Sequence, residues 1–337
     1  MKREEIKFEE IFSFENILAG FREFKKGKND KKDVADFSMN LINNLCSLHN
    51  DLISGNYKHS GYEHFKIIYP KERDIHKARV RDRVVHHCLY RALYSHFNKF
   101  FIHDSYSCRF DKGTHRALNR FAQFGRGASF NNAETLWILK CDIKKCFASV
   151  GQKILKVILR KYIFCPKILA VLDSVIESSS FGVDGRGIPL GNLTSQLFIN
   201  IYMNEFDQFV KRIMKVGKYI RYADDFIIFD RDKDCLLELI PKIADFLEES
   251  LGLTLHPSKI DLKTFTSGMD FLGWVHFPTH RVLRTSTKRR MFRRIKEKEG
   301  SKATIASYLG LLSHGNGYKL GVKVKDFCVN MGSWISA

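Results

Sequence analysis

Residues 218–229 (KYIRYADDFIIF) restrict the possible folds of this chain more than any other stretch. Aromatic and β-branched residues flank a polar centre, so the pattern predicts two strands joined by a tight turn. The turn carries two adjacent carboxylates, Asp224 and Asp225, which repel each other unless a cation shares them. Mg²⁺ suits such a place, because it prefers carboxylate oxygens and keeps substrate phosphates as further ligands. The alternative is a solvated turn, in which Asp is common.

A third carboxylate, Asp142, follows the apolar strand expected at residues 136–141 (LWILKC). A strand ending in Asp beside a hairpin ending in Asp-Asp would gather carboxylates at one sheet edge, the minimum for two-metal phosphoryl transfer. We therefore predict Asp142, Asp224 and Asp225 as catalytic residues and as ligands of two Mg²⁺ ions, which Mn²⁺ can replace. Asp142 and Asp224 are expected to bind both ions, whereas Asp225 either binds or acts mainly through its charge.

These two motifs resemble those of reverse transcriptases, a family of RNA-directed DNA polymerases. Residues 222–225 (YADD) are similar to its YxDD box, and Asp142 with Phe147 five residues later is similar to the preceding aspartate motif. The resemblance implies an enzyme that extends a cDNA primer with dNTPs on an RNA template, with the Ile143 backbone as a further metal ligand. It also implies that Phe147 is the steric gate against the 2′-hydroxyl of ribonucleotides. A core aromatic is the alternative for Phe147.

Residues 187–207 (GIPLGNLTSQLFINIYMNEFD) resemble the family motif that lies beneath the incoming nucleotide and the template base. The resemblance implies nucleotide-binding roles for Leu190, Gly191 and Gln196, and a glycine at 191 permits a close backbone approach. Most reverse transcriptases carry Gln where this chain has Leu190, and Pro where it has Gln196. Because Leu190 removes hydrogen bonds near the nascent base pair, we expect error-prone synthesis.

The combination LGNLTSQ resembles reverse transcriptases of diversity-generating retroelements, which are error-prone at template adenines. Residues 70–87, 101–118 and 221–226 are similar to that group too, and the whole resemblance covers roughly residues 60–280. It implies an accessory basic protein and a structured non-coding RNA as partners. Group II intron-like and antiphage-defence enzymes are near this group, and a defence enzyme that copies a dedicated non-coding RNA is the alternative. From another class, a non-catalytic RNA-binding scaffold on a polymerase fold is the rival hypothesis.

Several basic residues resemble family positions that contact phosphate. Lys71 and Arg73 follow the strand expected at residues 64–69 and are expected to hold the triphosphate, with plain surface charge as the alternative. Arg81 and Arg83 are expected either to contact the template or to pack structurally.

Two later motifs are expected at the leaving group and at the primer. LHPSKI resembles the family motif that supplies a lysine to the leaving pyrophosphate, so Lys259 is the candidate general acid, or else a plain surface lysine. Gly273, within MDFLGW, resembles the primer grip, with a buried apolar strand as the alternative. Residues 281–298 hold nine basic residues against one acidic residue, so we expect a thumb helix that binds duplex phosphates. The primer and template contacts expected there are Arg289, Arg290 and Arg293.

The overall charge agrees with a nucleic-acid partner. The 337 residues contain 56 Lys and Arg against 37 Asp and Glu, a formal net charge of +19, and neutralising phosphates releases counterions. An anionic membrane surface would also explain the charge, but no apolar run of about 18 residues is present, so we expect a cytoplasmic protein without a membrane partner. The eight cysteines are expected to be reduced thiols, and zinc bound by residues 86–88 (HHC) is the alternative.

These patterns and the resemblance predict an α+β right-hand polymerase with fingers, a palm of antiparallel sheet plus helices, and a small helical thumb. We expect N-terminal helices and fingers at 1–135, the palm at 136–280 with part of the fingers at about 152–188, and a basic helical thumb at 281–337. Apolar spacing also predicts helices at 152–178 and, as an amphipathic helix, at 192–210.

Shorter segments are expected between these elements. The composition of GRGASFNNAE predicts a loop at residues 125–134. Short strands are expected at residues 253–256 and 271–276.

Overall fold

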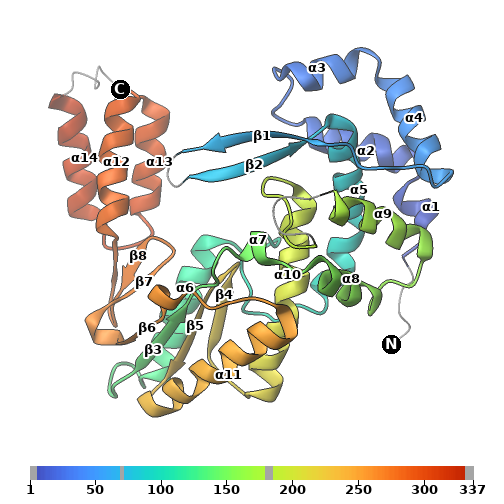
Figure 1. Ribbon diagram of the computed structural model, residues 1–337. Coiled ribbons are helices and arrows are strands. Elements are labelled where there is room, and N and C mark those ends of the chain that lie inside the picture. The colour runs from blue at the N-terminus through green and yellow to red at the C-terminus, as the bar shows by residue number, and fades with distance from the viewer. Residues whose placement is uncertain (1–5, 69–71, 179–184, 331–337) are drawn as a thin grey trace. The chain divides into compact units, whose positions relative to one another are not determined.

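The structure of the protein is a computed structural model that describes residues 6–68, 72–178 and 185–330 (Figure 1). These residues form helices and antiparallel sheets, in two compact units that each combine distant parts of the chain. The first unit contains Met1–Cys108, Ile143–Lys215 and Lys242–His256, and the second contains Arg109–Asp142, Val216–Pro241 and Pro257–Ala337. The assignment of fingers, palm and thumb to continuous residue ranges stays a prediction.

The first unit is mainly helical. In the described ranges its helices are α1 (Phe8–Ile11), α2 (Phe14–Lys25), α3 (Lys32–Met39), α4 (Leu41–Ile53), α5 (Val80–Asn98), α7 (Cys146–Ser149), α8 (Gln152–Arg160), α9 (Pro166–Glu177) and α10 (Leu193–Gln208), which continues as the π-helical turn η1 (Phe209–Ile213). The helix α11 (Lys233–Leu251) begins in the second unit and ends in the first. Ser13 caps α2 by accepting a hydrogen bond from the Asn16 backbone N–H at 3.2 Å.

The strands β1 (Tyr62–Ile67) and β2 (Arg73–Ala78) form an antiparallel hairpin in the first unit. β2 also holds the loop that precedes α10. The His76 backbone N–H donates to the Leu190 carbonyl at 3.2 Å, and the Asn192 side-chain amide donates to the His76 carbonyl at 3.4 Å. The hairpin and this loop are therefore fixed to each other within one unit.

Most of the helix α10 is buried, whereas the sequence predicted an amphipathic helix at 192–210. Asn200, Asn204 and Asp207 lie on the face that was expected to be solvated, and each is buried. The Asn200 side chain donates to the Ser107 carbonyl at 2.9 Å, so distant backbone replaces water as its partner. The prediction of a helix is confirmed, but the face opposite its apolar residues is mostly buried and not solvated.

The first sheet of the second unit has the strand order β4-β5-β3-β6. Its strands are β3 (Trp137–Cys141), β4 (Tyr219–Tyr222), β5 (Asp225–Asp230) and β6 (Asp261–Thr264). The helix α6 (Thr114–Ala128) packs on β4 and β5, with the Phe121 ring centroid 4.9 Å from that of Phe229. The predicted hairpin at 218–229 and the predicted strand at 136–141 are confirmed.

A second sheet and three helices complete this unit. The sheet comprises β7 (Met269–Phe271), β8 (Trp274–His276) and β9 (Arg281–Leu283), and short 3-10 turns lie at η2 (Pro257–Lys259) and η3 (Phe265–Ser267). The helices α12 (Thr285–Glu297), α13 (Lys302–Leu312) and α14 (Tyr318–Asn330) lie side by side (Figure 1). The basic segment expected to be helical from residue 281 thus begins with a strand, because Val282 pairs with Val275 and Leu283 is buried.

The loop predicted at residues 125–134 is only partly a loop, since α6 continues to Ala128. Gly125 lies inside this last helical turn. A Cβ atom at this position would lie 2.6 Å from the Phe265 ring, so the glycine serves close packing and not a turn. The sequence prediction was wrong here because it took Gly125 for a signal of irregular backbone.

Three other segments differ from the sequence expectations. The strand expected at 271–276 is interrupted by a turn, because β7 ends at Phe271 and β8 begins at Trp274. The helix predicted at 152–178 is broken into α8 and α9, and Pro166 occupies the first turn of α9. Residues 253–256 form no strand, and only Leu255 makes an isolated bridge, with Ile143.

The described elements confirm the α+β class with antiparallel sheets. The helices in the described ranges are each too short or too polar to cross a membrane.

Candidate active site

The turn between β4 and β5 carries the two adjacent aspartates. Tyr222 and Asp225 face each other at the end of the hairpin, so Ala223 and Asp224 form a two-residue turn. Ala223 has a φ of +56°, in the left-handed region that residues other than glycine rarely adopt. The buried Arg221 guanidinium donates to the Ala223 carbonyl at 3.0 Å and so stabilises the turn. Sequence reasoning missed Arg221, although a charge inside an apolar strand was a signal for it.

The register of the sheet brings Asp142 to the same end. The last pair between β3 and β5 lies one residue before Asp142 and one residue after Asp225, which places these two aspartates opposite each other. Their side chains are within hydrogen-bonding reach. The pKa of Asp225 is raised to about 6, chiefly by burial and also by the negative charges of Asp224 and Asp142, while Lys140 acts in the opposite direction. The predicted catalytic carboxylates therefore share one electrostatic environment.

Lys259 balances part of this negative charge. Its ammonium group lies 2.8 Å from Asp142 Oδ1, and the short turn η2 supplies it. The Lys259 side chain is 43% exposed and that of Asp142 is 13% exposed, so the lysine can exchange this partner for another. The structure brings Lys259 to the carboxylates, and its role as general acid stays a prediction.

The carboxylates are the type of ligand that a divalent cation prefers, although they do not form a complete coordination shell. Within the part of the chain that the structure describes, no three His, Cys, Asp or Glu side chains gather closely enough to hold a metal ion. Mg²⁺ takes carboxylate oxygens and keeps waters and phosphates as its other ligands, so it needs few protein ligands. A cation would also offset the negative neighbours that raise the pKa of Asp225.

The residues expected at the nucleotide lie in the first unit. The side chains of Phe147 and Leu190 are both half-buried. The Ile188 backbone N–H, two residues before Leu190, donates a hydrogen bond to the Phe147 carbonyl at 2.9 Å. Gly191 has a φ of +108°, and a Cβ atom there would lie 3.1 Å from the Ile75 side chain. Gln196 is exposed on α10. The structure ties the segments of Phe147 and Leu190 together, and nucleotide binding stays a prediction.

For three other expected site residues the structure gives little information about a functional role. Lys71 lies outside the described residues, and Arg73 begins β2 with a side chain that is not described. Ile143 is buried beside Leu255, with its backbone in the isolated bridge.

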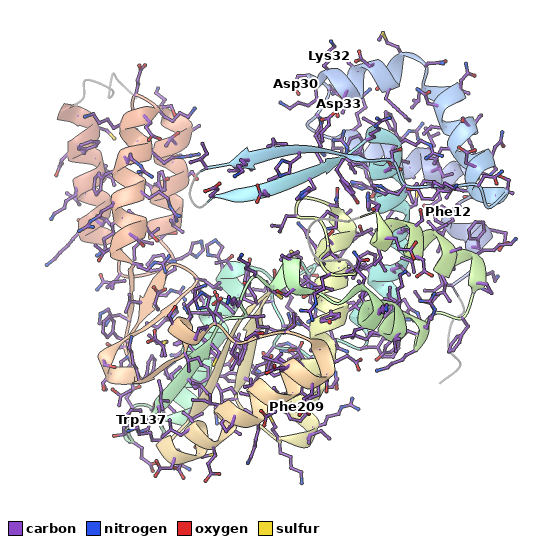
Figure 2. All side chains as sticks on the ribbon, in the orientation of Figure 1. Phe12, Asp30, Lys32, Asp33, Trp137 and Phe209 are labelled. Atoms are coloured by element: carbon purple, nitrogen blue, oxygen red, sulfur yellow. The ribbon has the colours of Figure 1, made fainter. Side chains whose placement is uncertain are left out.

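Arg81 and Arg83 are ion-paired inside the first unit. Arg81 lies 2.6 Å from Asp51, and Arg83 pairs with Asp33, which is labelled in Figure 2. These contacts favour the structural alternative for both arginines over template binding.

The turn between β7 and β8 carries the predicted primer-grip glycine. Leu272 and Gly273 have φ values of +50° and +86°. Positive φ at both central residues is typical of a type I′ turn, in which glycine is favoured.

The predicted thumb contacts lie on α12. Arg289 and Arg293 are exposed, and Arg290 is half-buried. Arg293 lies 3.7 Å from Glu297, one turn further along the helix. Phosphate binding by these residues stays a prediction.

The zinc alternative at residues 86–88 finds no support in the described structure. His87 faces Glu23 at 3.8 Å, Cys88 faces the backbone of α2, and His86 points to α10. The three side chains thus have three different partners.

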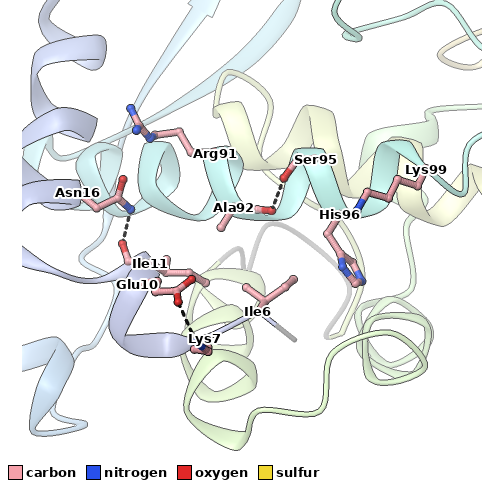
Figure 3. Close-up of a pocket in the computed structure, with 10 residues that line it drawn as sticks. All are labelled: Ile6, Lys7, Glu10, Ile11, Asn16, Arg91, Ala92, Ser95, His96 and Lys99. Carbon is pink, nitrogen blue, oxygen red and sulfur yellow. Dashed lines mark hydrogen bonds and ion pairs between the residues drawn. The ribbon is translucent and has the colours of Figure 1, made fainter. Parts of the chain in front are cut away.

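A cavity of about 630 Å³ lies among α1, α2 and α5 of the first unit (Figure 3). Lys7 and Glu10 pair in its wall at 3.2 Å, and Arg91 and Lys99 also line it. No predicted catalytic residue lines this cavity, so we do not assign the chemistry to it.

Comparison with known proteins agrees with the motifs and the fold. Residues 69–276 match the family model of reverse transcriptase (RNA-dependent DNA polymerase). The chain is 24% identical over 285 residues to Protein YkfC of Escherichia coli, with 72% of each protein covered. It is 20% identical over 323 residues to the putative COX1/OXI3 intron 2 protein of Saccharomyces cerevisiae, with 74% of this chain and 37% of that protein covered. The chain therefore spans little more than a third of that intron protein.

Solved structures show the same fold. A telomerase from Candida tropicalis in complex with a fragment of telomeric RNA superposes with a TM-score of 0.51 at 15% identity, covering 75% of this chain and 52% of that one. The apo telomerase from the same organism gives a TM-score of 0.51 at 14% identity, covering 69% of this chain and 49% of that one. This likeness confirms the predicted polymerase fold. Because the family model spans more than half of the chain, the protein belongs to the reverse transcriptase family, and its enzyme class is RNA-directed DNA polymerase.

Proposed function

We propose that this protein makes cDNA on an RNA template by nucleotidyl transfer at Asp142, Asp224 and Asp225. The observation that carries the proposal is the sheet register, which puts Asp142 opposite Asp225 with Asp224 in the adjoining turn. The substrates are dNTPs and the 3′-hydroxyl of a primer strand.

The three aspartates would hold two Mg²⁺ ions, for which Mn²⁺ can substitute. When bound, these ions lower the pKa of the attacking hydroxyl and neutralise the leaving pyrophosphate. Lys259, now paired with Asp142, would turn to the pyrophosphate and donate a proton there. Arg221 keeps the turn in place through the Ala223 carbonyl, so the carboxylates need little reorganisation.

Primer extension on an RNA template tests this function. Wild type should incorporate dNTPs with Mg²⁺ or Mn²⁺, and Asp224→Asn should lose about a hundred- to a thousandfold in rate, as expected for loss of electrostatic stabilisation. Asp245→Asn is the matched control, since Asp245 is an exposed aspartate on α11. Unchanged incorporation by Asp224→Asn would refute the catalytic role of this carboxylate. No incorporation by wild type under varied metals and partners would support the RNA-binding scaffold instead.

We further propose that synthesis is error-prone and belongs to a diversity-generating retroelement, with an accessory basic protein and a structured non-coding RNA as partners. Support comes from Leu190, whose half-buried side chain cannot supply the hydrogen bonds of a Gln near the nascent base pair. Sequencing of cDNA should show fewer errors for Leu190→Gln than for wild type. An error rate that does not change would refute the role of Leu190.

The second candidate is an antiphage-defence enzyme that copies a dedicated non-coding RNA. The same motifs also favour this candidate, because antiphage-defence reverse transcriptases are similar in sequence to those of the retroelement group. Gene neighbours separate the two: a variable-protein gene with template and variable repeats supports the retroelement, and a stand-alone defence cassette supports the second candidate.

A further inference from the structure

A line of hydrogen-bonded side chains runs through the first unit, from the segment before β1 to the start of α10. His59 Nε2 lies 3.1 Å from His86 Nε2 of α5, and His86 Nδ1 lies 2.6 Å from Thr194 Oγ1 of α10. His86 and Thr194 are 1% and 0% exposed. At the other end, His59 Nδ1 contacts the carbonyl oxygen of Ser60. None of these groups is among the predicted catalytic residues, so the line needs another explanation.

The Ser60 carbonyl at the end of the line determines which nitrogen of each histidine carries the proton. A carbonyl oxygen only accepts, so neutral His59 carries its proton on Nδ1 and offers a lone pair on Nε2. The Tyr62 hydroxyl also lies 3.3 Å from His59 Nε2, but it is 2.7 Å from Ser178 Oγ, which itself donates to a backbone carbonyl and so accepts the Tyr62 proton. His86 then donates to His59 from Nε2, which leaves a lone pair on His86 Nδ1. Thr194 therefore donates its hydroxyl proton to His86. As long as both rings are neutral, the line has one direction, from Thr194 to Ser60.

Both rings are held in the neutral form. Burial lowers the pKa of His86 well below its usual value, and the positive charges of its neighbours, including Arg83, act in the same direction. Burial also lowers the pKa of His59; Arg81 lowers it too, whereas the Asp82 carboxylate opposes this shift. The tautomers that the hydrogen bonds require therefore match the charge state that burial favours.

The His59 end of the line is rigidly anchored. The Tyr57 hydroxyl donates to one oxygen of the buried Asp82 at 2.9 Å, and the Ser60 backbone N–H donates to the other at 3.2 Å. The His59 backbone N–H donates to Ser174 Oγ of α9 at 3.0 Å. The loop that carries His59 cannot move without breaking three hydrogen bonds that are buried or partly buried.

The Thr194 end lies in the motif expected beneath the nucleotide. Thr194 is the second residue of α10 and follows Leu190 by four positions, and the N-terminus of α10 has no side-chain cap from Asn192. Four residues before Thr194, the Leu190 carbonyl accepts a hydrogen bond from the His76 backbone N–H of β2. The loop at residues 190–194 is thus held to β2 by one backbone hydrogen bond and by the Asn192 side chain, and to α5 by the Thr194 hydroxyl.

We propose that His59 and His86 form a positioning relay that fixes Thr194, and through it the Leu190–Gly191 loop that selects the incoming nucleotide. This inference rests on the proposed function, because it takes Leu190 and Gly191 as nucleotide contacts. The histidines do not touch substrate and act only through Thr194. If Thr194 is released, the loop can shift, so binding and selection of the dNTP suffer more than the chemical step.

The kinetic test compares Thr194→Val, which keeps the shape but loses the donor, with Thr194→Ser, which keeps the donor. Loss of one buried hydrogen bond corresponds to about a 5- to 10-fold effect, so Thr194→Val should raise the KM for dNTPs and the misincorporation frequency by that factor while kcat changes little. Thr194→Ser should stay near wild type. An unchanged KM and error frequency in Thr194→Val, whatever its melting temperature, would overturn the proposal.

A second pair of variants tests the histidines. His59→Gln offers an amide oxygen that accepts from His86, so it should stay near wild type, whereas His59→Leu should behave as Thr194→Val does. Equal KM and error frequency for His59→Leu and His59→Gln would show that the ring has only a packing role and would overturn the relay.

Nitrogen-15 NMR of the free protein reads the relay without any substrate. We expect Nδ1–H on His59 and Nε2–H on His86, with resonances assigned from the His59→Gln and His86→Asn variants. The reverse tautomer on either ring would overturn the relay. Absence of primer extension by wild type would count against the proposed function alone, because the tautomers would still decide whether the relay exists.

Discussion

The buried histidine of β8 makes the stability of the second unit depend on pH. His276 is 1% exposed, and its ring centroid lies 4.2 Å from that of Phe121. Burial, and to a lesser degree the charge of Arg281, lower the pKa of His276 to about 3. Its Nε2 atom has no hydrogen-bond partner among the described residues. The ring therefore stays neutral in the folded protein at pH values where it is charged in the unfolded chain.

The magnitude follows from the two pKa values. The unfolded chain takes up the proton first, near the ordinary histidine pKa of about 6.5, so stability is full above that pH and falls as the pH drops toward the folded pKa. Each pH unit within this window lowers the free energy of unfolding by about 1.4 kcal/mol. Between about pH 6.5 and about pH 5, His276 alone should cost about 2 kcal/mol.

The variant His276→Phe removes the titrating group and keeps an aromatic ring beside Phe121. Its free energy of unfolding should fall by about 2 kcal/mol less than that of wild type over the same pH range. Urea unfolding followed by tryptophan fluorescence measures this, because Trp274 lies in the same strand. His280→Phe, at an exposed position, is the matched control and should keep the wild-type slope. An equal pH dependence in wild type and His276→Phe would refute the reasoning.

Three other perturbations have defined outcomes. Gly125→Ala should lower the melting temperature although Ala favours helices by about 1 kcal/mol, because its Cβ would lie 2.6 Å from the Phe265 ring; adding Phe265→Leu should recover part of the loss in calorimetry. Arg221→Met should lower the free energy of unfolding in urea by about 1–3 kcal/mol, since the Ala223 carbonyl loses its buried donor. Arg290→Ala should reduce the slope of log affinity against log salt for a primer–template duplex by about one, measured by fluorescence anisotropy, and an unchanged slope would exclude a phosphate contact.

The catalytic hairpin could be predicted because its signals are local. Apolar residues flank a polar centre at residues 218–229, and the strand that ends before Asp142 is equally short and apolar. What the sequence could not supply is the register that sets Asp142 opposite Asp225, or the ion pair between Asp142 and Lys259. Both depend on strands and turns that are far apart in the chain.

The wrong structural predictions have a common physical cause. Burial and close packing place some residues in surroundings that differ from those their type usually indicates. Asn200 looked like part of a solvated face, but its side chain binds the Ser107 carbonyl. Gly125 looked like a loop residue, but it lets the Phe265 ring approach a helix. In each case a partner that is distant in sequence determines the environment of the residue, and local composition carries no information about that partner.

The interleaved segments of the two units have a consequence for synthesis on the ribosome. When His256 has emerged, the first unit has all of its segments, whereas the second still lacks everything from Pro257 onward. Until Asp261–Thr264 emerge, β3 has no neighbour on one side and offers an open edge to other nascent chains. At about 5–20 residues per second, this exposure is brief unless translation pauses. Codon usage across residues 257–264 should therefore influence the yield of folded protein.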